Sequence, residues 1–174
     1  MTTNTKSAIC FIPPIEQLSY VQSIRSKYDR AYERWMPHMN LFFPFLESDK
    51  LEDSVKELEK VLCQVAPFEI TFEKFDAFKR KKDATVHLAP QDNGEMAQIY
   101  QLICQTLKLE PDKRGFHPHL TVGQFKKGEL PMWLTKLTTE FEPHKFSYLC
   151  NAVYVIERGD DTPFEIKHVI KLGC

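Results

Sequence analysis

The sequence lacks several features that would each place it in a particular class of protein. Positive charge is not in excess, because 23 lysines and arginines are balanced by 24 aspartates and glutamates, for a net charge of -1. Such a chain has no global positive field with which to wrap duplex nucleic acid. No apolar run approaches the roughly 20 residues of a membrane-spanning helix, and residues 1–6 lack the apolar segment of a signal peptide. We therefore expect a cytoplasmic protein, or a nuclear one, with no membrane partner.

The cysteines lack any recognisable spacing pattern. The five cysteines are odd in number, far apart and mostly inside apolar stretches, at Cys10, Cys63, Cys104, Cys150 and Cys174. That spacing fits neither a disulfide framework nor a Cys-x-x-Cys zinc motif. The sequence thus predicts reduced thiols, as in an intracellular protein.

What is present is the composition of one folded domain. Hydrophobic residues make up 43% of the 174 residues and charged residues 27%, which is ordinary for a globular protein. We expect residues 1–6 to form a disordered tail, and residues 7–174 to form a single bilobal domain that acts as a monomer.

Hydrophobic periodicity predicts strands and helices in alternation. Apolar residues three and four positions apart indicate helices, whereas short apolar runs and two-residue alternation indicate strands. The expected strands are residues 7–14, 37–44, 68–78, 85–90, 116–125, 146–157 and 164–172, and the expected helices are residues 15–34, 49–65, 96–107 and 131–139. This order predicts an α+β fold.

Two stretches, one in each half of the chain, share one pattern. Proline, histidine, an apolar residue and a small hydrogen-bonding residue follow one another at residues 37–40 and again at residues 118–121. Because side chains alternate along a strand, His38 shares a face with Asn40, and His119 shares a face with Thr121. The repeat suggests two α+β lobes related by a pseudo-two-fold axis, with both histidine strands at the seam between them.

Two histidines that face one site can divide acid–base chemistry between them. Imidazole titrates near neutrality, so one ring can accept a proton from a nucleophile while the other protonates a leaving oxygen. Hydroxyl and amide groups beside them can bind the non-bridging oxygens of a phosphate, where negative charge concentrates during displacement. This arrangement requires neither a metal nor a cofactor, and we expect neither.

The repeated motif resembles the paired His-x-(Thr/Ser) signature of the two-histidine (2H) phosphoesterase superfamily, whose members are also called 2′-5′ RNA ligase-like proteins. Residues 37–41 (Pro-His-Met-Asn-Leu) are similar to the first motif, and residues 116–123 (Phe-His-Pro-His-Leu-Thr-Val-Gly) to the second. Residues 155–158 (Val-Ile-Glu-Arg) and 163–166 (Pro-Phe-Glu-Ile) also fit the closing pattern of the family. The resemblance therefore extends over nearly the whole chain.

The resemblance implies a fold, a chemistry and a set of site residues. The implied fold is the bilobal LigT-like one, with two antiparallel sheets and flanking helices around a central cleft. The implied activity is metal-independent cleavage of phosphodiesters in RNA ends, 2′,3′-cyclic nucleotides or 2′-5′-linked nucleotides. His38 and His119 would be the catalytic pair, in either order of acid and base, and Thr121 and Asn40 would bind phosphate. Asn40 departs from the usual Thr or Ser, although its amide can still donate to a phosphate oxygen.

Other residues are candidate substrate contacts, each with a plain structural alternative. By strand alternation, Phe42 is expected on the His38 face, and Gly123 and Phe125 on the His119 face, where a phenylalanine could stack on a base or belong to the core. The further candidates are His87, Arg114, Phe116, His117 and Tyr154. The basic residues at 79–82, with Arg114, Lys126 and Lys127, either lie in solvated turns or attract the phosphates of an RNA backbone.

Two further interpretations remain open at this stage. Because Asn40 replaces a hydroxyl residue, the chain could be a nucleotide- or RNA-binding module that uses the same cleft without turnover. It could also be an interaction scaffold in which the motifs are coincidental. The His117-x-His119 pair has no carboxylate or cysteine at ligand spacing, so we predict no metal there.

Overall fold

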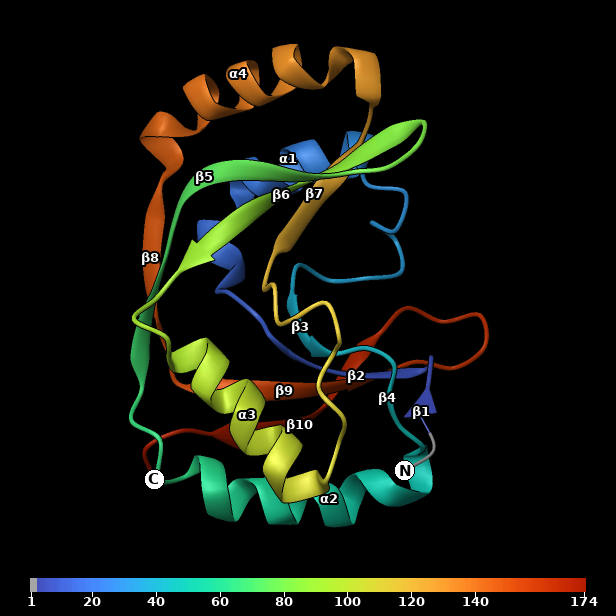
Figure 1. Ribbon diagram of the computed structural model, residues 1–174, viewed down its shortest axis with the longest axis vertical. Helices are drawn as coiled ribbons and strands as arrows, with labels where there is room; N and C mark the ends of the chain where they lie inside the picture. The colour runs from blue at the N-terminus through green and yellow to red at the C-terminus, as the bar shows by residue number, and fades with distance from the viewer. Residues whose placement is uncertain (1–2) are drawn as a thin grey trace.

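The computed structural model describes residues 3–174, which form two four-stranded antiparallel sheets and one two-stranded sheet (Figure 1). The strands are β1 (Thr3–Asn4), β2 (Ser7–Phe11), β3 (Met39–Phe42), β4 (Phe45–Leu46), β5 (Phe68–Lys79), β6 (Asp83–Gln91), β7 (Leu120–Lys126), β8 (Phe146–Cys150), β9 (Ala152–Glu157) and β10 (Glu165–Lys171). The helices are α1 (Ser19–Tyr28), α2 (Ser48–Leu62), α3 (Glu95–Leu107) and α4 (Leu130–Phe141), with the short 3₁₀ turns η1 (Ile15–Gln17), η2 (Lys127–Glu129) and η3 (Glu142–His144).

The order of strands places both histidine segments at sheet edges. One sheet runs β10-β9-β2-β3 and the other runs β7-β6-β5-β8, so β3 and β7 are edge strands of separate sheets. Figure 1 shows β3 and the start of β7 near the middle of the molecule, where the two sheets approach each other. The expected bilobal α+β architecture with two antiparallel sheets is confirmed.

The helices are exchanged between the two sheets. Helix α1 follows β2 in sequence but packs on β7 of the other sheet, together with α4. Helix α3 follows β6 but packs on α2, which lies against β10. Because α1 and α3 each pack in the lobe opposite to the strand that precedes them, the two lobes share one main core.

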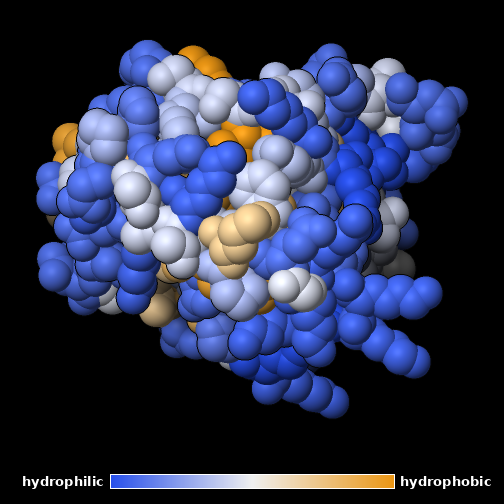
Figure 2. Space-filling model, turned by 90° about the horizontal axis from the view of Figure 1, so that it is seen from above, coloured by the Kyte–Doolittle hydropathy of each residue, from blue (hydrophilic) through white to orange (hydrophobic). Residues whose placement is uncertain are grey.

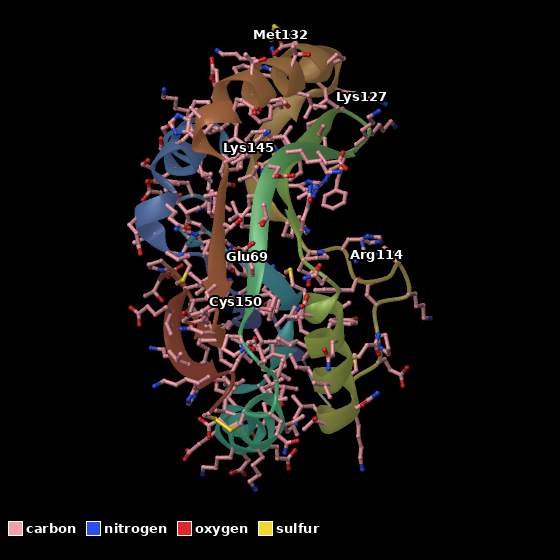
Figure 3. All side chains as sticks on the ribbon, turned by 90° about the vertical axis from the view of Figure 1, so that its left-hand side faces the viewer. Glu69, Arg114, Lys127, Met132, Lys145 and Cys150 are labelled. Atoms are coloured by element: carbon pink, nitrogen blue, oxygen red, sulfur yellow. A yellow bond between two sulfur atoms is a disulfide. The ribbon has the colours of Figure 1, made fainter. Side chains whose placement is uncertain are left out.

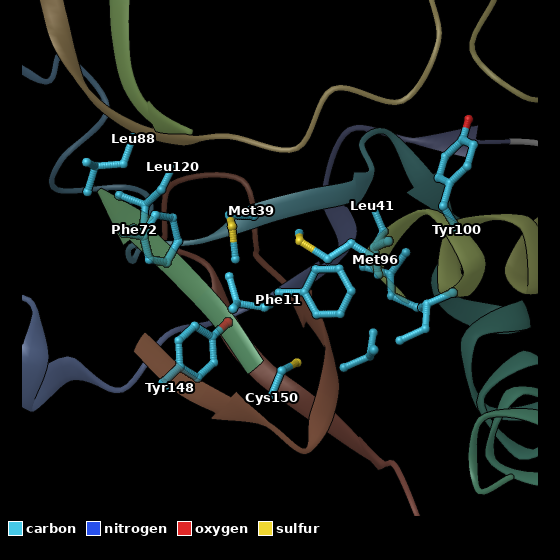
Figure 4. Close-up of a cluster of buried hydrophobic side chains, with 14 of the residues drawn as sticks. Phe11, Met39, Leu41, Phe72, Leu88, Met96, Tyr100, Leu120, Tyr148 and Cys150 are labelled. Atoms are coloured by element: carbon cyan, nitrogen blue, oxygen red, sulfur yellow. The ribbon is translucent and has the colours of Figure 1, made fainter. Parts of the chain in front are cut away.

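Burial explains the long apolar run of β2. All five residues of this strand are buried. Ile9 and Phe11 face the main core, whereas Ala8 and Cys10 face a smaller cluster with Ile156 and Phe164. A strand covered on both faces reads as a continuous apolar run rather than as an alternation. Figure 4 shows part of the main core, with Phe11, Met39 and Leu41 close to one another.

Several expectations about the chain need correction. The tail at residues 1–6 is not wholly disordered, because β1 pairs with β4; residues 1 and 2 lie outside the described part of the chain. The single strand expected at residues 146–157 is two strands in different sheets, since β8 pairs with β5 and β9 pairs with β2 and β10. The long helix expected at residues 15–34 is divided into η1 and α1 and ends at Tyr28.

The cysteines do not all remain free thiols. Cys63, at the end of α2, forms a disulfide with Cys174, and their Cα atoms lie 5.0 Å apart. The expectation of five reduced cysteines was wrong, because sequence spacing could not show that the last residue returns to α2. Cys10, Cys104 and Cys150 are free and buried. No helix within residues 3–174 is long and apolar enough to cross a membrane.

A buried ion pair holds the segment that leads from α1 to the first histidine. The guanidinium of Arg25 lies 2.9 Å from a carboxylate oxygen of Asp29, and these side chains are only 2% and 3% exposed. Arg25 also donates to Gln22 Oε1 and to the Trp35 carbonyl, and Asp29 accepts from the backbone N–H of Ala31. The pair therefore fixes the turn that places residues 35–38.

Replacement of Asp29 by alanine should destabilise the fold by about 3–5 kcal/mol, because it leaves the Arg25 guanidinium buried without its counter-charge. Urea unfolding followed by circular dichroism measures this change. Glu52→Ala is the matched control, since it breaks a solvent-exposed i,i+4 pair with Lys56 and should leave the midpoint where it is. Equal effects of the two substitutions would contradict a structural role for the buried pair.

Replacement of Gly123 by alanine should also destabilise the protein. A Cβ atom at Gly123 would lie 2.6 Å from Tyr28 Cβ and 3.0 Å from the Tyr28 backbone, so α1 would have to move away from β7. We expect a loss of about 1–3 kcal/mol, as is usual for overpacking, measured by urea unfolding. Gly128→Ala, where nothing lies within 4 Å of the added atom, is the control and should not destabilise. A wild-type midpoint for Gly123→Ala would show that α1 is not closely packed on β7.

Candidate active site

The two histidines stand in equivalent places and make equivalent hydrogen bonds. His38 immediately precedes β3, and His119 immediately precedes β7. His38 Nδ1 lies 2.7 Å from the Met36 carbonyl oxygen, and His119 Nδ1 lies 2.7 Å from the His117 carbonyl oxygen. Because a carbonyl can only accept, Nδ1 carries the hydrogen in both rings. Nε2 is therefore the nitrogen that can exchange a proton with a substrate in each ring.

The structure brings the two imidazoles within electrostatic range of each other. The pKa of His38 is lowered to about 4, mainly by burial and, to a smaller extent, by the charges of Arg25 and His119. The Met36 carbonyl and the Asp29 carboxylate act in the opposite direction. Burial also lowers the pKa of His119. Both rings are consequently neutral at pH 7 in the free protein, and a charge on either one would act on the other.

The two residues expected to bind phosphate, Asn40 and Thr121, lie two residues after the histidines, within β3 and β7. Asn40 is half-buried in β3, and within residues 3–174 its buried Oδ1 atom has no hydrogen-bond partner. Thr121 is half-buried in β7, directly opposite His87 of β6. The Asn40 side-chain oxygen thus keeps an accepting capacity that no residue in the described part of the chain uses.

The His38 ring is held by an aromatic residue that the sequence interpretation missed. The Trp35 ring stacks on it, with centroids 4.5 Å apart and an angle of 17° between the planes. Phe164 in turn stacks on Trp35 at 3.8 Å, and the Arg158 guanidinium lies 5.6 Å from the centre of the Phe164 ring. The only signal in the sequence was a tryptophan three residues before the histidine.

The His119 ring has different neighbours. The centre of the His87 ring lies 5.2 Å from the centre of the His119 ring. The Phe78 ring packs edge-on against His119, with a distance of 4.8 Å between ring centres. Phe78 also stacks on His87 at 4.3 Å, so the three rings form one cluster. His87 is 5% exposed, and burial, followed by the charge on His119, lowers its pKa to about 4. The structure thus places the candidate His87 beside His119, and Phe78 is a second residue that the sequence interpretation missed.

Two residues expected on the histidine faces lie elsewhere because of register shifts. In the β6–β7 pairing, Val86 is opposite Gly123 but His87 is opposite Thr121, so one extra residue reverses the alternation. Phe125 is consequently 4% exposed and packs on Tyr28, with ring centroids 4.9 Å apart. The predictions that Phe125 and Gly123 share the His119 face were wrong.

A similar shift removes Phe42 from the face of His38 and Asn40. In the β2–β3 pairing, Asn40 is opposite Cys10 but Phe42 is opposite Ile9. Phe42 stacks on Tyr100 at 4.7 Å, and Tyr100 stacks on Phe116 at 4.6 Å. Phe42 and Phe116, both candidates for substrate contact, therefore pack on opposite sides of Tyr100 in one stack of three rings.

Of the remaining candidates, His117 contacts His119 through its backbone carbonyl, whereas the side chains of Arg114 and Tyr154 have other partners. Arg114 is exposed and forms a two-pronged ion pair with Asp112, and its carbonyl oxygen is 2.8 Å from His117 Nε2. Tyr154 packs beside the smaller apolar cluster and lines a cavity of about 500 Å³ with residues of β8 and β9. Within residues 3–174 no cluster of three or more histidine, cysteine or acidic side chains could hold a metal ion.

Comparison with known proteins agrees with this geometry. The pattern of the 2′-5′ RNA ligase superfamily matches residues 13–162. A candidate phosphoesterase of Halalkalibacterium halodurans is 26% identical over 162 residues, covering 92% of each chain. The RNA 2′,3′-cyclic phosphodiesterase of Bacillus subtilis is 33% identical over 86 residues, covering 45% of this chain and 47% of that protein.

Solved structures show the same fold at low sequence identity. The crystal structure of E. coli LigT complexed with 3′-AMP has a TM-score of 0.66 and 16% identity, and the match covers 98% of this chain and 99% of LigT. With two histidine motifs beside edge strands of separate sheets and a family pattern that spans most of the sequence, this chain belongs to the 2′-5′ RNA ligase superfamily, the two-histidine phosphoesterases.

Proposed function

We propose that this protein is a phosphodiesterase that hydrolyses 2′,3′-cyclic or 2′-5′-linked phosphodiesters in RNA ends and small nucleotides, without a metal. The observation that carries the proposal is the matched pair of imidazoles, each with Nδ1 bound to a backbone carbonyl and Nε2 available. Two such nitrogens supply both proton transfers that hydrolysis requires, so no metal-bound water is needed.

We assign the base to His38 and the acid to His119. His38 has its pKa lowered to about 4, so its Nε2 is free to take a proton from water as the water oxygen attacks phosphorus. The negative phosphate raises the pKa of the nearby His119, which then gives its proton to the 2′- or 3′-oxygen as the bond from phosphorus to that oxygen breaks. The amide of Asn40 and the hydroxyl of Thr121 donate to the non-bridging oxygens, where charge accumulates.

The relatives support this substrate class. One similar protein is named as an RNA 2′,3′-cyclic phosphodiesterase, and the LigT structures contain 3′-AMP and ATP, which are small nucleotides. A ribonucleotide with a cyclic phosphate is therefore the first substrate to test. If the protein binds it but leaves it intact, the chain is a binding module instead.

Hydrolysis of a 2′,3′-cyclic mononucleotide should continue in excess EDTA and should depend on both histidines. His38→Ala and His119→Ala should each lower kcat about 10²- to 10⁴-fold, the usual contribution of one acid–base group. Chromatographic separation of the opened monophosphate measures the rate and identifies the product. His168→Ala is the control and should keep the wild-type rate. His168 lies on β10, the edge strand opposite β3 in the same sheet. Loss of activity in EDTA, or full activity in both site variants, would rule out the mechanism.

The pH optimum of kcat/KM should lie on the acid side of 6.5. The base is active only above the lowered pKa of His38, about 4, and the acid is active only below the lowered pKa of His119. Both limits of the bell-shaped profile in the free enzyme therefore move towards low pH. Bound phosphate raises the pKa of His119, so the optimum of kcat should lie higher than that of kcat/KM. An optimum of kcat/KM above pH 7 would contradict the assignment of base and acid.

A further inference from the structure

The β5–β6 hairpin carries an exposed aromatic ring directly beside His119. Phe78, near the end of β5, is 40% exposed, although its edge meets His119 and one part of its surface stacks on His87. His87 is buried and forms a rigid support for that ring. An exposed phenylalanine held against a firm base is suited to stack on a nucleobase, because every base has an apolar face.

The same hairpin ends in a cluster of unpaired positive charge. Lys79, Arg80, Lys81 and Lys82 are all exposed, and none of them has an ion pair within residues 3–174. The carboxylate of Asp83, which follows them, is engaged by Arg30 at 3.0 Å. This local concentration contrasts with the net charge of -1 for the whole chain.

The end of β7 adds to this cluster. The backbone N–H of Lys127 lies 3.3 Å from the carbonyl oxygen of Lys82, which joins the start of η2 to the hairpin turn. Figure 3 shows Lys127 beside the tip of the hairpin, and the hairpin projects from the same side of the molecule as the loop that carries Arg114. Viewed from above, this end of the molecule is mostly hydrophilic, with only scattered apolar side chains (Figure 2).

We propose that the hairpin is a binding surface for single-stranded RNA that leads to the catalytic pair. Phe78 stacks on the base next to the scissile phosphate, and residues 79–82 with Lys127 bind the backbone phosphates of the nucleotides upstream. The inference rests on the proposed function and narrows its substrate to an RNA chain end rather than a free nucleotide. An aromatic platform beside a line of positive charge is the usual construction of a single-strand site, whereas a solvated basic turn lacks the platform.

The test compares uridine 2′,3′-cyclic phosphate with a hexanucleotide that ends in the same cyclic phosphate. Wild-type protein should hydrolyse the hexanucleotide with a KM at least about 10-fold lower, and this advantage should decrease as salt is raised from 50 to 200 mM, because bound phosphates release counterions. In the variant K79Q/R80Q/K81Q/K82Q, the ratio of kcat/KM for the two substrates should fall towards one. The control K56Q/K60Q/K167Q/K171Q removes the same charge from α2 and β10 and should keep the wild-type ratio.

The aromatic part is tested separately. Phe78→Ala should raise KM about 10-fold for both substrates, since both carry a base, with a smaller effect on kcat, and Phe78→Trp should restore binding. Leu149→Ala, which truncates an exposed apolar residue on β8, should change neither constant. The thermal midpoint of each variant confirms that it is folded.

The outcomes separate the inference from the proposed function. Equal KM values for both substrates in the wild type, with the same salt dependence, would overturn the RNA surface and leave the phosphodiesterase intact. If neither substrate is hydrolysed, the proposed function fails, and fluorescence anisotropy with the labelled hexanucleotide decides the inference. Tighter binding to the wild type than to the hairpin variant would support the surface, and equal binding would reject it.

Discussion

The constraint on which the site depends is the meeting of two sheet edges. Strands β3 and β7 are edge strands of separate sheets and do not pair with each other. No continuous ladder of backbone hydrogen bonds therefore joins the two sheets at these strands. Each strand begins just after a histidine whose Nδ1 is bound to a carbonyl two residues earlier. This short local bond orients each ring in the same way without help from the other lobe. Packing of the helices between the two lobes then sets the position of the His38 ring relative to the His119 ring.

The approximate symmetry of the backbone does not extend to the surroundings of the two rings. His38 is covered by Trp35, which is anchored through its carbonyl to the buried Arg25–Asp29 pair. His119 instead borders His87 and the partly exposed Phe78. The first environment is closed and keeps the imidazole neutral, because burial disfavours its charged form. The second leaves an aromatic surface open to a ligand. Two similar motifs therefore place their imidazoles in different surroundings.

Burial of so many imidazoles would be costly if they had to be charged. The pKa of His38 and that of His87 are both lowered to about 4, so both rings stay neutral in the folded protein at physiological pH. Because the unfolded chain binds protons near pH 6.5 and the folded chain does not, stability should decline as pH falls from that value towards 4. The same burial that limits stability in acid keeps the His38 imidazole unprotonated in the free protein.

The sequence alone determined the features that depend on neighbouring residues, which are most of the helices and strands and the repeated histidine motif. Most helix and strand positions followed from periodicity. The Pro-His-x-(Asn/Thr) repeat predicted that His38 and His119 are a pair, because residue type and spacing along the chain are local properties. Register was not local: a single extra residue in β3 and another in β7 turned Phe42 and Phe125 away from the expected faces, and only pairing with β2 and β6 set those shifts. The Cys63–Cys174 disulfide, the division of residues 146–157 and the approach of Trp35, Phe78 and His87 to the histidines likewise depended on contacts between distant segments. Tertiary structure decided these because packing, rather than sequence neighbourhood, selects which side chains share a surface.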